Sequence, residues 1–250
     1  MSIMRSITCI VLLMLSGCIT SFDGRTPPKP KPKAAAKAYF QLGVNYMAKG
    51  RYDLAEIKLQ KSIAIHSTAE AYNALAVLYE ELHDNTLAEQ IYQELLTRFP
   101  DYGRGYLNYL FFLCQYDRRS QIDTVLTEAA GKGREIAAIS HIAAGNCALK
   151  NGDENEAKHQ YQRALDYEQY AAGALLPLAE MHWKDKQFIK AKSQVDLVNN
   201  QIGYSARSLY LATLIERSLG HQQQARKMYQ ELIKRFPNSQ EAKKLSGKKE

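Results

Sequence analysis

Apolar side chains recur every three to four residues from about residue 34 to residue 245, which is the period of an amphipathic helix. The stretch from Ala138 to Tyr170 shows the pattern most clearly, because Gly152 divides it into two helical segments. Counting Ala138 as position 1, small residues stand at position 8 (Gly145) and position 20 (Ala157). The pattern therefore predicts a pair of antiparallel helices that approach each other closely at these positions.

The same spacing recurs along the chain, since the residues at position 20 lie 33, 34, 35, 34 and 34 residues apart. They are Ala55, Ala88, Ile122, Ala157, Ala191 and Ala225. A helix pair that repeats about every 34 residues is typical of the tetratricopeptide repeat, in which one pair cannot bury its apolar face alone. We predict an all-α solenoid of six such repeats, forming a right-handed superhelix, at approximately 36–68, 69–102, 103–137, 138–171, 172–205 and 206–238. The third repeat is degenerate, because Ile122 occupies the small-residue position.

The N-terminus precedes the repeats and has the pattern of a lipoprotein signal. Arg5 is followed by an apolar run that is short for a membrane span, and Leu15-Ser16-Gly17-Cys18 ends it. We predict that residues 1–17 are removed and that Cys18 is acylated, since several acyl chains together give a stable anchor. The alternative is an ordinary secretory signal or a helix with an incidental cysteine. No Asp follows Cys18, which favours the outer membrane, with the protein facing the periplasm.

Residues 18–33 alternate Pro and Lys and predict an extended tether of about 45 Å between the lipid and the repeats. Residues 246–250 predict a polar tail. The net charge is +7, and basic and acidic residues alternate along the predicted helices. This distribution indicates solvated helix faces and argues against nucleic acid as a partner.

Two cysteines remain in the body of the chain once Cys9 is removed and Cys18 is acylated. Cys114 and Cys147 lie 33 residues apart, almost one repeat, in the first helices of consecutive repeats. Stacked helices lie about 8–10 Å apart, and an exported protein meets an oxidising compartment. These observations are compatible with a disulfide between them and also with two buried thiols that pack as small apolar groups.

No catalytic or cofactor-binding pattern is present. The six His residues are scattered without a His-Glu-x-x-His pair, and neither a Cys-x-x-Cys pair nor a glycine-rich phosphate loop occurs. His141 and His182 fall on first helices and are interpreted as packing or surface residues, not as metal ligands. Asp153 and Glu154 are interpreted as helix caps. We therefore expect no cofactor, no metal and no enzymatic activity.

A stack of such repeats offers a binding surface on its first helices. Apolar residues there either pack within the superhelix or bind a partner. In the first three repeats they form a patch flanked by two polar residues, suited to an apolar helix or strand of another protein. The predicted partner-binding residues are Phe40, Val44, Met47, Asn73, Val77, Glu80 and Phe111.

Several segments resemble a known family of repeat lipoproteins. They are the lipobox, Phe112-Leu113-Cys114-Gln115, Leu176-Pro177-Leu178-Ala179-Glu180, Ser208 to Gly220 and Arg235-Phe236-Pro237-Asn238-Ser239-Gln240-Glu241-Ala242. Together with the six-repeat length, they are similar to the PilF/PilW lipoproteins of type IV pilus biogenesis. The resemblance spans nearly the whole chain, and the second helix of the third repeat departs from it.

The resemblance implies a pilotin, which assists the outer-membrane localisation or multimerisation of secretin subunits, the ring through which the pilus emerges. The implied partners are those subunits and, through Cys18, the lipid of the outer membrane. One alternative is another outer-membrane repeat lipoprotein, such as a β-barrel assembly component or an adaptor for peptidoglycan enzymes. A third is a periplasmic hydrolase that uses the repeats as a scaffold.

Overall fold

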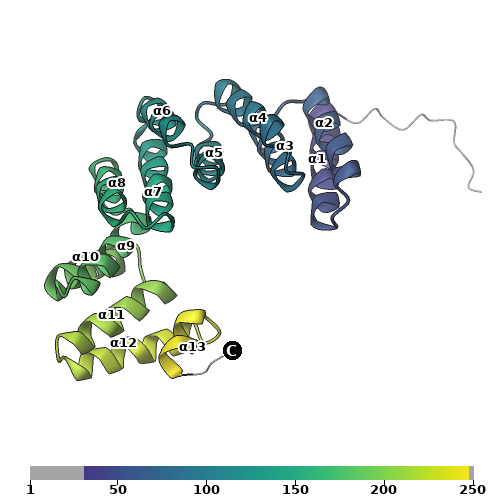
Figure 1. Cartoon of the computed structure of the whole chain (residues 1–250). Helices are drawn as coiled ribbons and strands as arrows, with labels where there is room; N and C mark the ends of the chain where they lie inside the picture. Colours follow the sequence, from purple (N-terminus) through teal and green to yellow (C-terminus); the bar gives the residue numbers. More distant parts are fainter. Residues whose placement is uncertain (1–30, 248–250) are drawn as a thin grey trace, which may run out of the picture. The chain divides into compact units, whose positions relative to one another are not determined.

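The computed structural model of the chain describes residues 31–247, and every regular element in that range is a helix. The predicted signal peptide, Cys18 and most of the predicted tether lie outside the described residues. The first twelve helices form six consecutive hairpins, and α13 follows the last of them (Figure 1). The helices are α1 (Pro32–Ala48), α2 (Tyr52–Ile65), α3 (Ala69–Glu81), α4 (Asn85–Arg98), α5 (Gly103–Gln115), α6 (Arg119–Ala130), α7 (Arg134–Lys150), α8 (Glu154–Tyr167), α9 (Ala172–Lys184), α10 (Phe188–Gln201), α11 (Ala206–Ser218), α12 (Gln222–Arg235) and α13 (Gln240–Ser246).

The hairpins stack in chain order. Each first helix packs on its own second helix, and the first helices also contact one another from α1 through α3, α5, α7 and α9 to α11. Contacts therefore run only between neighbours along the stack, as expected for a solenoid. The structure confirms the predicted all-α solenoid. None of the helices in the described part of the chain is both long and apolar enough to cross a bilayer.

The two ends of the stack differ slightly from the predicted bounds. Helix α1 begins at Pro32, two residues before the predicted start at residue 34, because proline fits the first turn of a helix, where its missing N–H is not needed. At the other end α13 adds a short helix after the sixth repeat. Its Ser239 cap accepts a hydrogen bond from the Ala242 N–H (3.1 Å), and buried Ala242 packs with Leu209 and Leu232.

The turn inside each hairpin uses the same backbone conformation. The residue at position 15 has a positive φ in all six repeats, between 51° and 80°. Glycine occupies it in three repeats, whereas His83, Asp117 and Lys186 occupy it in the second, third and fifth. Side-chain caps start several of the helices; the Asp153 carboxylate accepts a hydrogen bond from the Glu156 N–H (3.0 Å), as predicted for a cap.

Positions 8 and 20 place small, buried residues between the two helices of a hairpin. In the fourth repeat these are Gly145 and Ala157, and Ala157 is fully buried. A Cβ atom added at Gly145 would lie 2.7 Å from the Tyr161 ring, whose side chain is also fully buried. The Tyr161 hydroxyl donates a hydrogen bond to Asn146 Oδ1 (2.7 Å), which fixes the ring in place. Position 8 must therefore stay small for the two helices to meet.

The third repeat departs from this rule at both positions. It carries Leu110 at position 8 and Ile122 at position 20, where the other repeats carry small residues at position 20 and Gly, Ala or Thr at position 8. Two branched side chains keep the helix axes apart, so α5 and α6 pack less closely than the helices of the other hairpins. Helix α5 instead contacts α7, the first helix of the next repeat, more extensively than it contacts α6.

A disulfide joins α5 and α7 at this irregular junction. Cys114 and Cys147 are bonded in the structure, and their Cα atoms lie 5.7 Å apart. That separation falls in the usual range for a disulfide, and both residues are buried. The structure thus favours the bonded alternative over two separate thiols. The bond links the two first helices where the pairing within the third hairpin is weakest.

We expect the mature protein recovered from an oxidising compartment to contain this disulfide. Peptide mapping without reduction should recover a linked pair of peptides that contain Cys114 and Cys147. Replacing both residues by serine should lower the free energy of unfolding by about 2–4 kcal/mol, because the bond restricts the unfolded chain. Two alkylatable thiols in the native, unreduced protein would contradict this prediction.

Gly145→Ala should lower the free energy of unfolding by about 1–3 kcal/mol, because the added methyl meets a buried ring that has no room to move. The matched control is Gly103→Ala on α5, where the new Cβ would make only ordinary contacts at 3.7 Å or more. Urea denaturation of the two variants measures the difference. Equal stability of the two variants would show that the contact of Gly145 with Tyr161 does not limit how closely the two helices pack.

Candidate partner-binding surface

The predicted partner-binding residues all lie on three first helices that contact one another in sequence. Phe40, Val44 and Met47 belong to α1; Asn73, Val77 and Glu80 belong to α3; Phe111 belongs to α5. Helix α3 touches both α1 and α5. The fold therefore brings the predicted residues to one row of helices, but it gives them different roles.

The exposed apolar part of the row consists of the residues at position 9. Val44 is 39% exposed, Phe111 is 46% exposed, and Val77 between them is partly exposed. We call these three residues the apolar row. In the next two repeats the same position is polar and already engaged: Asn146 accepts from Tyr161, and Glu180 accepts from Arg207 Nη2 (3.0 Å). The apolar row is thus interrupted after α5, although position 9 is again apolar in the sixth repeat, where Leu214 on α11 is partly exposed.

Three of the other predicted residues are already in contact with side chains of the repeats. Phe40 and Met47 are half-buried and pack against the core of the first repeats. Asn73 Oδ1 accepts a hydrogen bond from Asn108 Nδ2 (2.8 Å), which joins α3 to α5. These contacts orient the helices that carry the apolar row, so we assign these residues a positioning role.

Glu80 is committed to a contact within its own repeat. Its carboxylate accepts a hydrogen bond from the hydroxyl of Tyr92 on α4, a ring that is fully buried. Burial raises the pKa of the Glu80 carboxyl above its ordinary value, although the hydrogen bond from Tyr92 acts in the opposite direction. The residue that the sequence pattern identified therefore links α3 to α4 through its hydrogen bond with Tyr92. It is not a free charge beside the apolar row.

Two pockets that the sequence did not reveal flank helix α6. The larger, of about 810 Å³, lies among α4, α5 and α6. The smaller, of about 410 Å³, lies among α6, α7 and α8. Both follow from the loose pairing of α5 and α6. The signal in the sequence was available, because Leu110 opposite Ile122 replaces the small pair found in most other repeats.

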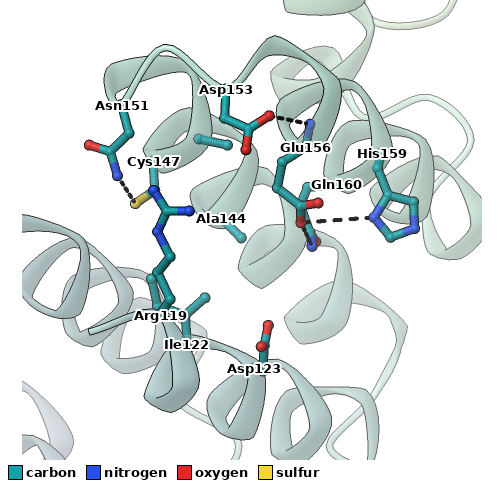
Figure 2. Close-up of a pocket in the computed structure, with 11 residues that line it drawn as sticks. Arg119, Ile122, Asp123, Ala144, Cys147, Asn151, Asp153, Glu156, His159 and Gln160 are labelled. Carbon is teal, nitrogen blue, oxygen red and sulfur yellow. Dashed lines mark hydrogen bonds and ion pairs between the residues drawn. The ribbon is translucent and has the colours of Figure 1, made fainter. Parts of the chain in front are cut away.

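The smaller pocket is lined by both apolar and polar side chains (Figure 2). Ile122, Ala144 and the disulfide-bonded Cys147 belong to the apolar part of its lining. In the polar part of the lining, Gln160 Nε2 donates to Glu156 Oε1 (2.6 Å), and Gln160 Oε1 in turn contacts His141 Nδ1 (2.6 Å). Asp153, also in the lining, accepts from the Glu156 N–H (3.0 Å), and no arrangement of a nucleophile with a base is present among these residues.

The histidines on first helices are hydrogen-bonded to side chains of their own hairpin. His141 is buried, stacks on the Tyr167 ring at 5.6 Å and has its pKa lowered by burial. His182 Nδ1 lies 2.8 Å from Gln194 Oε1. Among residues 31–247, no group of three or more His, Cys, Asp or Glu side chains is placed to hold a metal ion.

Comparison with known proteins supports the repeat assignment. Tetratricopeptide repeat models match residues 40–103 and 207–239. The chain is 25% identical over 254 residues to the type IV pilus assembly protein PilF of Pseudomonas aeruginosa, and the match covers 100% of both chains. In a solved structure of Pseudomonas aeruginosa PilF, 87% of this chain and 99% of that chain superpose with a TM-score of 0.57. The structure of PilW, a type IV pilus biogenesis factor, matches at 22% identity and a TM-score of 0.53, over 84% of this chain and 98% of that one, and shows the same fold.

The chain is a PilF/PilW-like tetratricopeptide repeat protein. The predicted fold class and the predicted resemblance are both confirmed. Proteins of this fold are typically scaffolds that present rows of side chains to another chain.

The partly buried carboxyl of Glu80 predicts a pH dependence of stability in this PilF/PilW-like protein. The pKa of the Glu80 carboxyl is higher in the folded protein than in the unfolded chain, so folding is favoured while this carboxyl is protonated, below the unfolded-state pKa. This contribution to stability is lost as the pH rises through the folded-state pKa. Glu80→Gln removes the ionisation and leaves an acceptor for Tyr92. Its stability relative to the wild type should therefore increase from about pH 4.5 to pH 7.

Urea denaturation at several pH values measures this difference, and Glu70→Gln, at an exposed site on the same helix, is the control. A difference between Glu80→Gln and the wild type that does not change with pH would show that the Glu80 carboxyl is not held in a desolvating site.

Proposed function

We propose that the chain is an outer-membrane lipoprotein that acts in type IV pilus biogenesis by holding secretin subunits on its first three repeats. The observation that carries the proposal is the match over the full length of both chains to PilF, a type IV pilus assembly protein. The exposed apolar row supports a binding role and identifies where a partner segment would lie.

The chemistry of the apolar row suits a mainly apolar segment of a partner. Neighbouring helix axes lie about 8–10 Å apart, so successive side chains of the row recur at about that distance. A partner helix that lies across the row presents residues i, i+7 and i+14 at steps of about 10.5 Å. An extended strand presents only every second residue on one face, at steps of about 6.6–6.8 Å, so it fits this spacing less well than a helix. Val44 and Phe111 are the members with the most exposed surface to offer.

The proposed mechanism involves no chemical turnover. Acyl chains on Cys18 carry the protein to the outer membrane, and the Pro/Lys tether lets the repeats reach a subunit. A bound subunit is then held near the membrane at a high effective concentration, which favours assembly of the ring. The periplasmic face of the outer membrane is the location at which this mechanism operates.

The test is a pull-down from detergent-solubilised outer membrane with Val44→Ser combined with Phe111→Ser. We expect retention of the secretin to fall at least about tenfold, because the two substitutions remove most of the exposed apolar surface of the row. The matched control is Ile189→Ser combined with Ile202→Ser; Ile189 is 69% and Ile202 is 56% exposed on the fifth repeat. Unchanged retention by the row variant, with a native circular dichroism spectrum, would contradict the proposed site.

Deletion of the gene and replacement by the Cys18→Ser form test the function itself. We expect loss of surface pili and of heat- and detergent-resistant secretin multimers in the deletion, and reduced multimers with Cys18→Ser. General outer-membrane defects with normal pili would instead favour a β-barrel assembly component or a peptidoglycan-enzyme adaptor.

A further inference from the structure

The first hairpin exposes a face that is covered in every later repeat. Position 7 of the repeat is buried in repeats two to six, where the first helix packs on the preceding repeat; these residues are Leu75, Tyr109, Ala144, Leu178 and Ala212. In the first hairpin the same position is Leu42, which is 43% exposed. Within the described residues no helix packs on this side of α1. The opposite end of the stack is covered by α13.

Exposed side chains of α2 adjoin this face of α1. Tyr39 lies one helical turn before Leu42, and its ring lies beneath Lys61 Nζ (4.6 Å) and Lys58 Nζ (5.9 Å). Ile57, next to Lys58 and one turn before Lys61, is 55% exposed. We call these five residues the end face. It combines large apolar side chains with ammonium groups whose stems lie over an aromatic ring.

The positive charge of the described chain is concentrated in this hairpin. Residues 31–65 contain seven Lys and Arg residues against two acidic residues, and α1 contains no acidic residue at all. Residues 66–247 contain 21 Lys and Arg residues against 22 acidic residues. The remaining repeats are therefore close to neutral, and the first hairpin is a local basic region at one end of the stack.

We propose that the end face docks on an anionic phospholipid surface. Apolar side chains that enter the boundary of the acyl region and lysines that contact negatively charged headgroups are the two components of interfacial membrane binding. The end face supplies both. It also follows the N-terminal segment directly, since only 13 residues separate Cys18 from Pro32, where α1 begins.

Docking by the end face is compatible with use of the apolar row. Leu42 and Val44 are two residues apart on α1, and successive residues of a helix are rotated by about 100°, so their side chains leave the helix on nearly opposite sides. The membrane-facing residues and the partner-facing residues therefore do not compete. This inference goes beyond the proposed function and does not require the partner to be a secretin.

Vesicle co-sedimentation tests the docking with the mature chain carrying Cys18→Ser, so that no acyl chain contributes. The probes are vesicles of phosphatidylglycerol and phosphatidylcholine in equal parts, and vesicles of phosphatidylcholine alone. We expect binding to the anionic vesicles only, weakened at 0.5 M salt by screening. Lys58→Glu with Lys61→Glu should weaken it at least about tenfold, and Leu42→Ser with Ile57→Ser should weaken it at both salt concentrations.

The charge-matched control is Lys158→Glu with Lys190→Glu, at exposed sites on α8 and α10, which should leave binding nearly unchanged. If Lys58→Glu with Lys61→Glu unfolds the protein, the milder Lys58→Gln with Lys61→Gln replaces it. Equal weakening by both lysine pairs, or equal binding to both kinds of vesicle, would overturn the proposal. Sedimentation velocity without vesicles tests whether a second copy of the chain covers the end face. The proposal would also be overturned if the protein formed a dimer that Leu42→Ser with Ile57→Ser dissociates while vesicle binding stays unchanged.

Discussion

The close approach of two helices at one pair of positions is the constraint on which the structure depends. Where position 8 is glycine, as at Gly145, a large ring such as Tyr161 can fill the space beside it and still be fully buried. The resulting hairpin is compact but leaves one side of its first helix uncovered. That side is buried only when the next hairpin stacks on the preceding one. The local contact thus determines the period of the sequence and the need for a stack.

The third repeat shows what happens when this constraint is relaxed. With Leu110 and Ile122 at the two positions, α6 packs less closely on α5, and pockets form on both sides of α6. Helix α5 contacts α7 more extensively than it contacts α6. The disulfide between Cys114 and Cys147 lies at this junction and joins the two first helices directly. A covalent link between neighbouring repeats compensates for weak packing inside one of them, so the row of first helices remains continuous across the junction.

The regular part of the fold could be predicted from the sequence because small residues and turn residues repeat at a fixed interval. The candidate surface could be predicted only in part. Periodicity places Phe40, Glu80 and Val44 on the same side of their helices, but it does not show that Phe40 packs inward or that Glu80 receives the hydroxyl of Tyr92. Those contacts come from neighbouring helices, whose side chains are about 12 or more residues away in sequence. The end face escaped prediction for a similar reason, since Leu42 looks like any core leucine of the pattern.

A stack of similar units has two ends, and in this chain the two ends differ. The C-terminal end is closed by α13, a short helix whose Ala242 is buried against the last repeat. The N-terminal end keeps an apolar face and gathers basic residues around it. A face that was open only for lack of a partner repeat would be expected to lose its large apolar side chains, because exposed Leu42 and Ile57 favour aggregation. Their presence beside Lys58 and Lys61, on the hairpin that follows the predicted lipid anchor in sequence, is the combination that an anionic membrane surface would stabilise.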